Sequence, residues 1–578
     1  MRNVMSGAKP AAIPVPVTTS ASCGPRPARS SCGYRNFGCR PLRRRSGRSQ
    51  GFPDNIYRPT VHGLEQVPNT THPCNDTNRD VSGLNSLIFG DVWYFGAAAP
   101  ILPAHFGLRM AGNARRGHRR SDTLIRAVTE MDDISLQTAL DRVADADILL
   151  VQGVPPDSEY RFKYALIQDA AYENLLKSRR HVLHRRVGEV LRDHFATTAA
   201  VEPELLAHHF SEAGLTEAAI EWWGKAGQRS LERSALVEAI AQFTRALDRI
   251  AILPATPALR RDEIRVQVAL ITPLMYVKGF AAPETKAAVE RARLLIEQAE
   301  ALGEPAEDPL LLFVVLYGMW GALGATANWD AARDLGAQFL TLAEKQGAPV
   351  PLMVGQRLMG VSLMAIGNLV EGRDHFDRAI ALYDPAQHHA LAGRFGQDPG
   401  AAVSAFRSLA QWLLGFGEGA VATADQALDN ARNSGQAGTL MYVLYFISPL
   451  HLLMGNYTTA AAQAQELFAL AEERVASYWI QRAPFVQGCI LASTGNPTDA
   501  VQLMTSCLTA WPEMGTTYWL PLYKSYLAKA YAELGNFVDA WRCVGEAIRA
   551  VETTKETMFE AEMYRIAAKS PGRRSRIW

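Results

Sequence analysis

The sequence predicts an all-α protein, a right-handed α-solenoid of helix pairs, and three observations point to this fold. The chain of 578 residues has 48% hydrophobic and 20% charged residues, the composition of a folded chain long enough for several domains or one long array. Gly-Asn pairs recur at positions 367, 455, 495 and 535. Small residues after these and two related turns stand at 332, 372, 420, 460, 500 and 540, at intervals of 40, 48, 40, 40 and 40. A fixed period in this range indicates a helical repeat array.

The spacing within each unit predicts two packed helices. A glycine ending the first helix can adopt the left-handed conformation of a C-cap, and the Asn or Asp after it is expected to cap the second helix. The small residue fits where the two helices cross closely. Apolar residues follow it at i+4 and i+7, as in Ala460, Ala464 and Leu467, which is the stripe of a helix with one buried face.

The earliest unit resembles the tetratricopeptide (TPR) consensus. Trp223, Ala226, Gly227 and Ser230 stand in its first helix, and a second helix carries Ala239, Phe243 and Ala246. The pattern of aromatic, small and small residues, followed by Ala, Phe and Ala, is specific to this repeat. We predict eight TPR-like units, with helices longer than average because the period exceeds about 34 residues.

Three segments of the array have a second interpretation. The long interval contains residues 384–400, with two Asp-Pro pairs, which we interpret as an extended inter-repeat loop rather than a site. The uncharged runs 310–329 and 439–457 are long enough to cross a membrane. Both runs coincide with predicted repeat helices, and the first has acidic flanks, so we interpret them as buried helices.

Residues 122–195 follow a different pattern. It predicts helices over 124–131 and 135–146, a hairpin of strands 148–152 and 160–164 around Pro155 and Pro156, and a helix over 167–195. Helices followed by a hairpin are the parts of a winged helix. The basic residues of the last helix are the candidates for phosphate contacts in the alternative of nucleic-acid binding: Lys177, Arg179, Arg180, Arg185 and Arg186.

The junction between this segment and the array resembles a known family. Residues 162–180, 183–186 and 203–214 are similar to the region after the ATPase core in bacterial signalling proteins. In these proteins a class III adenylate/guanylate cyclase precedes a STAND-type AAA+ ATPase, a winged helix and a TPR array. The resemblance covers residues 121–568 and implies a cytoplasmic signal-transduction protein.

The catalytic parts of that family have no counterpart in the sequence. No GxxxxGK[ST] motif occurs, and we find no paired cyclase carboxylates in a strand-like context. Without the P-loop Lys and hydroxyl, ATP hydrolysis has no chemical basis. We therefore expect no enzymatic activity, no cofactor, no metal site and no nucleotide ligand. A chain truncated or frame-shifted near Ser121 is the hypothesis that accounts for the missing parts.

The net charge of +1 is the sum of unlike parts. Residues 1–120 hold 17 of the 59 Lys+Arg and 5 of the 58 Asp+Glu, together with four of the seven Cys. We divide the chain into a disordered Arg/Pro-rich head (1–120), a winged-helix-like remnant (121–200), the repeat array (201–568) and a basic tail (569–578). A zinc site at His72 and Cys74 is less favoured than unpaired thiols in a reducing cytoplasm.

The function that these patterns favour is a non-catalytic protein–protein interaction scaffold that binds a protein or peptide in the concave groove of the array. The alternatives are a nucleotide-dependent cyclase or ATPase, by resemblance, and nucleic-acid binding through the winged helix; no membrane partner is expected. Aromatic and Arg residues dominate binding sites. The candidate groove residues are Arg357, Trp412, Tyr442, Tyr445, Arg482, Phe485 and Lys529.

Overall fold

The computed structural model describes residues 122–129, 131–154, 158–304 and 307–569. The predicted head (1–120), with its four Cys and the His72–Cys74 alternative, lies outside the described residues, as does the tail after Lys569.

Two helices and a hairpin open the described chain. α4 (Asp122–Val128) and α5 (Asp133–Asp145) precede the antiparallel strands β1 (Leu149–Gln152) and β2 (Glu159–Phe162). The hairpin agrees with the sequence prediction. Side chains from all four elements form a small apolar core: Ile125, Leu136, Leu140, Val143, Leu149 and Tyr160.

The helix predicted over 167–195 is two helices, α6 (Ala165–Glu173) and α7 (Lys177–His194). The Asn174 side-chain amide donates to the Ala170 carbonyl (2.9 Å), and Leu176 has the non-helical angles φ −57° and ψ 140°. Asn competes with helix propagation by bonding its own backbone. The prediction of one continuous helix is therefore wrong at this turn.

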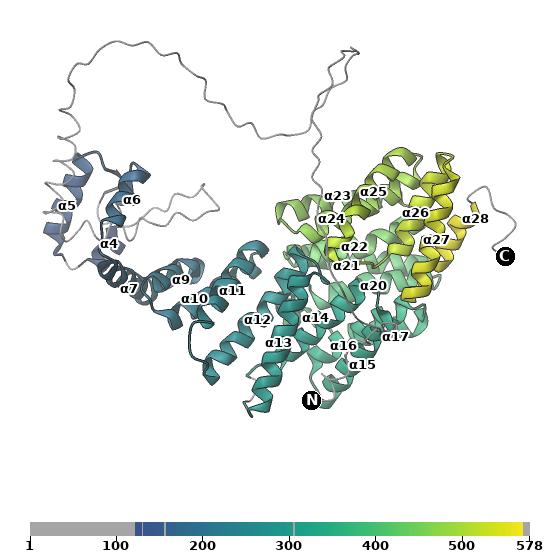
Figure 1. The fold of residues 1–578 in the computed structure, drawn as a ribbon, viewed down its shortest axis with the longest axis horizontal. Coiled ribbons are helices and arrows are strands. Elements are labelled where there is room, and N and C mark those ends of the chain that lie inside the picture. The colour runs from purple at the N-terminus through teal and green to yellow at the C-terminus, as the bar shows by residue number, and fades with distance from the viewer. Residues whose placement is uncertain (1–121, 130, 155–157, 305–306, 570–578) are drawn as a thin grey trace, which may run out of the picture. The chain divides into compact units, whose positions relative to one another are not determined.

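Eight helix pairs follow α8 (Ala196–Val201) and α9 (Pro203–Glu212) in the described chain, and successive pairs lie side by side (Figure 1). The pairs are α10 (Thr216–Glu232) with α11 (Leu236–Ile250), α12 (Pro257–Val277) with α13 (Pro283–Ala301), α14 (Leu310–Ala325) with α15 (Trp329–Gln346), α16 (Pro349–Ala365) with α17 (Leu369–Ala381), α20 (Pro399–Leu413) with α21 (Gly417–Asn433), α22 (Ala437–Met454) with α23 (Tyr457–Glu473), α24 (Ser477–Ser493) with α25 (Pro497–Met514), and α26 (Leu520–Glu533) with α27 (Phe537–Thr554). Helix α28 (Glu560–Lys569) packs on α26 and α27. The described array is a TPR-like α-solenoid, which confirms the predicted fold class.

The small anchor residues lie where the helices of a pair cross. The five alanines among them are 0% exposed, namely Ala332, Ala420, Ala460, Ala500 and Ala540. The sixth anchor is Gly372, where a Cβ atom would meet the Gly360 carbonyl oxygen at 2.9 Å. The 40-residue spacing therefore marks these helix crossings, as expected.

The Gly-Asn turns act mainly through their glycines. The four glycines have φ between 78° and 87°, the left-handed region expected of helix C-caps. The predicted Asn caps are formed at Asn536, whose side chain accepts from the Asp539 N–H. At Asn368 and Asn456 the side chain makes no cap bond, so that part of the prediction is wrong there.

The two uncharged runs form helices within the array. Helix α22 is the one helix among the described residues that is long and apolar enough to cross a membrane, and 78% of its apolar window is buried. Helix α14 has eleven buried residues of sixteen. Packing between neighbouring helices accounts for their apolar composition.

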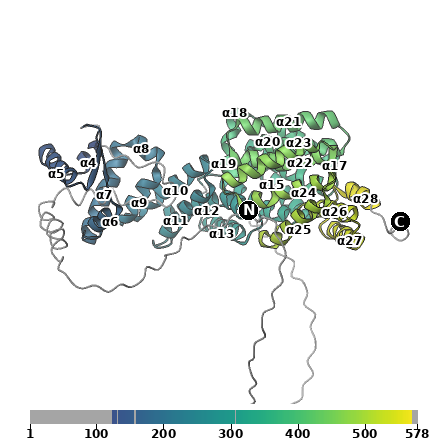
Figure 2. The same ribbon diagram turned by 90° about the horizontal axis from the view of Figure 1, so that it is seen from above.

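The segment between α17 and α20 corrects a second expectation. It forms the short helices α18 (Pro385–His388), η1 (His389–Leu391) and α19 (Ala392–Phe395). Helix α19 contacts α12 and α14, and Figure 2 shows it beside α12. The insertion is thus folded against the array and is not an extended loop.

The helix crossings predict a large effect of added volume. Ala420 is fully buried on α21, so Ala420→Leu should lower the free energy of unfolding by ~1–3 kcal/mol through overpacking. Urea denaturation followed by circular dichroism measures the change.

Ala422→Leu is the matched control, because Ala422 is exposed on the same helix. Its unfolding free energy should stay within about 0.5 kcal/mol of the unsubstituted chain. Equal effects of the two substitutions would contradict the assigned crossing.

Candidate interaction site

The candidate groove residues divide into two sets. Trp412 and Lys529 are half-buried. The other five are enclosed in the array, with exposed fractions of 1% for Arg357, 4% for Tyr442, 1% for Tyr445, 0% for Arg482 and 0% for Phe485. The expectation that these five line an open groove is wrong for this structure, because neighbouring units cover them; a binding role for them stays a prediction.

Arg357 and Tyr442 meet inside the array. The Arg357 Nη2 donates to the hydroxyls of Tyr317 (3.0 Å) and Tyr442 (3.3 Å), and its guanidinium lies 5.4 and 5.5 Å from their ring centroids. Burial acts to lower the pKa of Arg357, but Tyr442, Tyr317 and Tyr276 act against it and the pKa is raised. The Nε and Nη1 atoms of Arg357 have no hydrogen-bond partner among the described residues. This cation is therefore only partly satisfied by its surroundings.

Arg482 and Tyr445 form a second buried pair. The Arg482 Nε donates to the Tyr445 hydroxyl (2.9 Å), which also bonds the Tyr523 hydroxyl (2.7 Å). The backbone carbonyl of Tyr518 accepts from Arg482 Nη2 (3.3 Å). The rings of Tyr445 and Trp519 are stacked, with their centroids 5.1 Å apart. Arginine over aromatic faces is stabilised by cation–π attraction. These residues therefore hold the array together from within.

Two loops explain why the interior is closed. In the loop before α26, the Thr517 N–H donates to the carbonyl of Ala325, the last residue of α14 (2.8 Å). In the loop before α28, the Thr557 N–H donates to the carbonyl of Ala365, the last residue of α16 (2.9 Å). Each loop satisfies a carbonyl that lacks a partner within its own helix. Units far apart in the sequence are thereby brought into contact.

Glu556 is a buried carboxyl in the second of these loops, 3% exposed. Its oxygens accept from the Trp519 N–H (3.0 Å) and the Trp329 Nε1 (3.4 Å). Burial raises the pKa of Glu556 to about 8, although both hydrogen bonds favour the charged form. The sequence gives no signal for this residue, because its partners stand up to 227 positions away.

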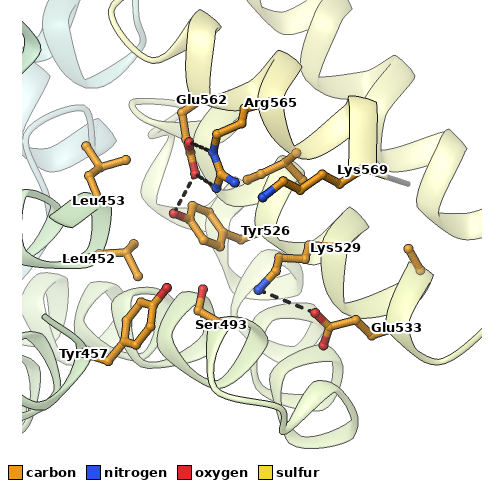
Figure 3. A pocket seen from close by; sticks show the side chains of 12 residues that line it. Leu452, Leu453, Tyr457, Ser493, Tyr526, Lys529, Glu533, Glu562, Arg565 and Lys569 are labelled. Atoms are coloured by element: carbon orange, nitrogen blue, oxygen red, sulfur yellow. Dashed lines mark hydrogen bonds and ion pairs between the residues drawn. The ribbon is translucent and has the colours of Figure 1, made fainter. Parts of the chain in front are cut away.

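An open pocket lies in the C-terminal part of the array. It has a volume of about 480 Å³ and is formed by α22, α23, α24, α26 and α28 (Figure 3). The lining side chains are Leu452, Leu453, Tyr457, Ser493, Tyr526, Lys529, Ala532, Glu533, Glu562, Arg565, Ile566 and Lys569. Lys529 is the one candidate groove residue among them.

The pocket combines apolar walls with charged groups. Lys529 donates to the Ala492 carbonyl (2.5 Å) and pairs with Glu533 (3.5 Å). Glu562 accepts from the Tyr526 hydroxyl (3.0 Å) and pairs with Arg565 (2.6 Å). Lys569 is exposed and has no acidic partner in the described part of the chain. The pocket therefore offers an uncompensated positive charge beside aromatic and aliphatic surface.

Helical spacing could have found more of this pocket. Tyr526, Lys529 and Glu533 follow i, i+3, i+7 on α26, and Glu562, Ile566 and Lys569 follow i, i+4, i+7 on α28. Each set lies on one helix face. Within the described ranges no group of three or more His, Cys, Asp or Glu is arranged to hold a metal ion.

Comparison with known proteins gives distant similarities. No family model matches the chain. An uncharacterized protein of Rhizobium meliloti (strain 1021) is 22% identical over 438 residues, which are 75% of this chain and 42% of that protein. The chain thus spans less than half the length of this relative.

Solved structures with similar helices are also distant. A Signal Transduction ATPase with Numerous Domains (STAND) protein with a tetratricopeptide repeat sensor from Pyrococcus horikoshii gives a TM-score of 0.45 at 11% identity, over 86% of this chain and 68% of that one. A Rap protein complexed with competence and sporulation factor gives a TM-score of 0.42 at 12% identity. The similarity covers 66% of this chain and 99% of the Rap chain.

Glu556 predicts a pH-dependent stability. The folded carboxyl binds its proton more tightly than an unfolded one, so its contribution is present below pH ~4.5 and is lost as the pH rises to about 8. Glu556→Gln keeps an oxygen acceptor and removes the titration. The variant should be more stable than the unsubstituted chain by ~2–4 kcal/mol at pH 9, and the difference should shrink toward pH 5. Urea midpoints across this range measure it.

Glu552→Gln serves as the control, because Glu552 is exposed on the preceding helix. It should leave the pH profile unchanged. A Glu556→Gln profile parallel to that of the control would show that the buried carboxyl does not titrate in this range.

Proposed function

We propose that the array is a non-catalytic protein- or peptide-binding module of a cytoplasmic signalling protein. The observation that carries this proposal is the pocket of about 480 Å³ (Figure 3). Three helices that are each the first of a pair (α22, α24 and α26) contribute to it, together with the terminal helix α28. A cavity of this size accommodates one or two side chains of a bound segment.

The chemistry of the lining specifies the partner segment. The pocket carries the cations Lys529, Arg565 and Lys569 against the carboxylates Glu533 and Glu562. Two of the cations are paired, which leaves Lys569 for an acidic group of the partner. The half-buried Leu453 and Tyr457 offer apolar surface in the same pocket. A segment with an apolar residue next to an acidic one fits this arrangement.

The signalling assignment rests on the resemblance of residues 121–568 to cyclase–STAND–TPR proteins. We propose that residues 121–200 are the winged-helix part of such a protein and that residues 201–568 are its array. The observed hairpin of β1 and β2 supports the first assignment. A cyclase or ATPase activity would contradict the non-catalytic proposal, and assays of ATP turnover and cyclic-nucleotide formation on the purified full chain test it.

Nucleic-acid binding is the less supported alternative, because three of its five basic residues are engaged within the chain. Arg180 donates to the Leu175 carbonyl (3.0 Å) and Arg186 to the Thr129 carbonyl (3.2 Å). Arg185 pairs with Glu189 (2.9 Å). Lys177 and Arg179 are exposed. Salt-dependent DNA binding by the full chain would favour this alternative.

The pocket predicts which peptides the array binds. A randomised displayed peptide library selected against the full chain should yield sequences with an acidic residue beside an apolar one. Lys569→Glu should weaken their binding about tenfold by reversing the charge, and Tyr457→Ala should weaken it by removing apolar contact. Titration calorimetry with a selected synthetic peptide measures both.

Val538→Ala is the control, since Val538 is 82% exposed on α27 and does not line the pocket. It should leave the affinity unchanged. Selected peptides whose affinity is the same for all three variants would overturn the assignment of the pocket.

A further inference from the structure

The insertion between α17 and α20 places its last residues inside the array. We name residues His389–Asp398 the inner segment. Phe395 and Gln397 are 0% exposed and Asp398 is 1% exposed. Such burial is unusual for polar loop residues unless they are hydrogen-bonded. The inner segment is therefore held by the inside of the array as a ligand would be.

Hydrogen bonds tie the inner segment to units distant in sequence. Its Arg394 carbonyl accepts from the Thr272 hydroxyl of α12 (2.9 Å). Its Asp398 N–H donates to the Thr439 hydroxyl of α22 (2.8 Å). The Phe395 ring packs edge-on against Tyr317 of α14, with centroids 5.5 Å apart. An aromatic anchor together with backbone and side-chain hydrogen bonds is also how a peptide segment is held on a protein surface.

Gly396 allows this close approach. Its φ is +85°, and a Cβ atom there would lie 2.7 Å from the Tyr276 ring. Its carbonyl oxygen lies 2.9 Å from where a Cβ of Gly438 on α22 would be. Glycine is the residue that combines left-handed φ with such contact.

The hydroxyl group of Tyr317 bridges Gln397 and Arg357. Its Oε1 accepts from the Tyr276 hydroxyl (3.1 Å), and its Nε2 donates to the Tyr317 hydroxyl (2.8 Å). The same Tyr317 oxygen accepts from Arg357 Nη2 (3.0 Å). Arg357 forms no ion pair with a carboxylate of the described residues, and its Nε and Nη1 have no hydrogen-bond partner there. A neutral amide occupies a place next to a buried, uncompensated cation.

We propose that the inner segment is a built-in occupant of a second peptide-binding surface, formed by Thr272, Tyr276, Tyr317, Arg357 and Thr439. The external ligand is a peptide that adopts the turned conformation of the inner segment, with an aromatic side chain at the place of Phe395 and a carboxylate at the place of Gln397. A carboxylate accepts from both tyrosine hydroxyls and neutralises Arg357, which the Gln397 amide cannot do. This surface is distinct from the pocket of the proposed function.

The tether sets the expected affinity. The inner segment is joined to α17 and α20, so it competes with an external peptide at a high effective concentration. An external peptide binds only the fraction of molecules in which the segment has left. Weakening the segment should therefore strengthen peptide binding, the reverse of what removing a contact residue does.

The test uses a fluorescein-labelled peptide with the sequence of residues 389–398 and Glu in place of Gln397, added to the full chain. The double variant Phe395→Ala, Gln397→Ala should bind it at least about tenfold more tightly than the unsubstituted chain, measured by fluorescence anisotropy. The peptide with Gln should bind the double variant about tenfold more weakly than the Glu peptide. Adding Arg357→Gln to the double variant should abolish its preference for the Glu peptide over the Gln peptide.

Equal affinities of the two peptides, or binding that the double variant does not strengthen, would overturn the proposal. Tyr457→Ala distinguishes this proposal from the proposed function, because Tyr457 lines the pocket and is not part of the second peptide-binding surface. If Tyr457→Ala abolishes binding of the labelled peptide, the peptide binds in the pocket, and the inference is also overturned.

A single substitution tests the same surface if the double variant does not fold. Gln397→Glu in the intact chain should raise the thermal midpoint at pH 7, and should lower it when combined with Arg357→Gln, because the carboxylate then lacks its cation. A midpoint that Gln397→Glu lowers equally in both backgrounds would contradict the proposed pairing.

Discussion

Backbone hydrogen bonds from two late loops to the ends of two early helices determine the form of this array. The carbonyls of Ala325 and Ala365 end α14 and α16, where an α-helix has no internal partner for them. Thr517 and Thr557 supply the missing donors from loops one repeat apart. Because the same contact recurs at consecutive units, the array closes on itself in a regular way, and the inner face of its first helices is covered.

Closure changes the role of the inward-facing side chains. In an open groove Arg357, Tyr445 and Arg482 would meet a partner, whereas here tyrosine hydroxyls and aromatic faces surround them. Buried cations are tolerated when hydrogen bonds and ring faces replace water. All three guanidinium nitrogens of Arg482 donate hydrogen bonds, whereas only one nitrogen of Arg357 does. The incompletely bonded cation is the one beside the inner segment.

The two proposed interaction surfaces differ in accessibility. The pocket of α22 to α28 is open and charged at Lys569. The surface around Arg357 is occupied by residues of the same chain, with Gln397 between Tyr276 and Tyr317. The first can meet a partner without a change of structure, and the second requires that a tethered segment leave. An acidic residue of the ligand is the chemical feature that we propose for both surfaces.

The sequence by itself determined the helix pairs, their crossings and the hairpin, because these depend on local spacing. Ala420 and Ala460 are buried where the 40-residue period placed them. Asn174 broke a helix that apolar periodicity alone made continuous. Tertiary structure decided which face stays open: Ala325 meets Thr516 across 191 residues, and Trp329 meets Glu556 across 227. No local pattern encodes such contacts, since they arise only when the accumulated rotation of successive pairs brings distant units together.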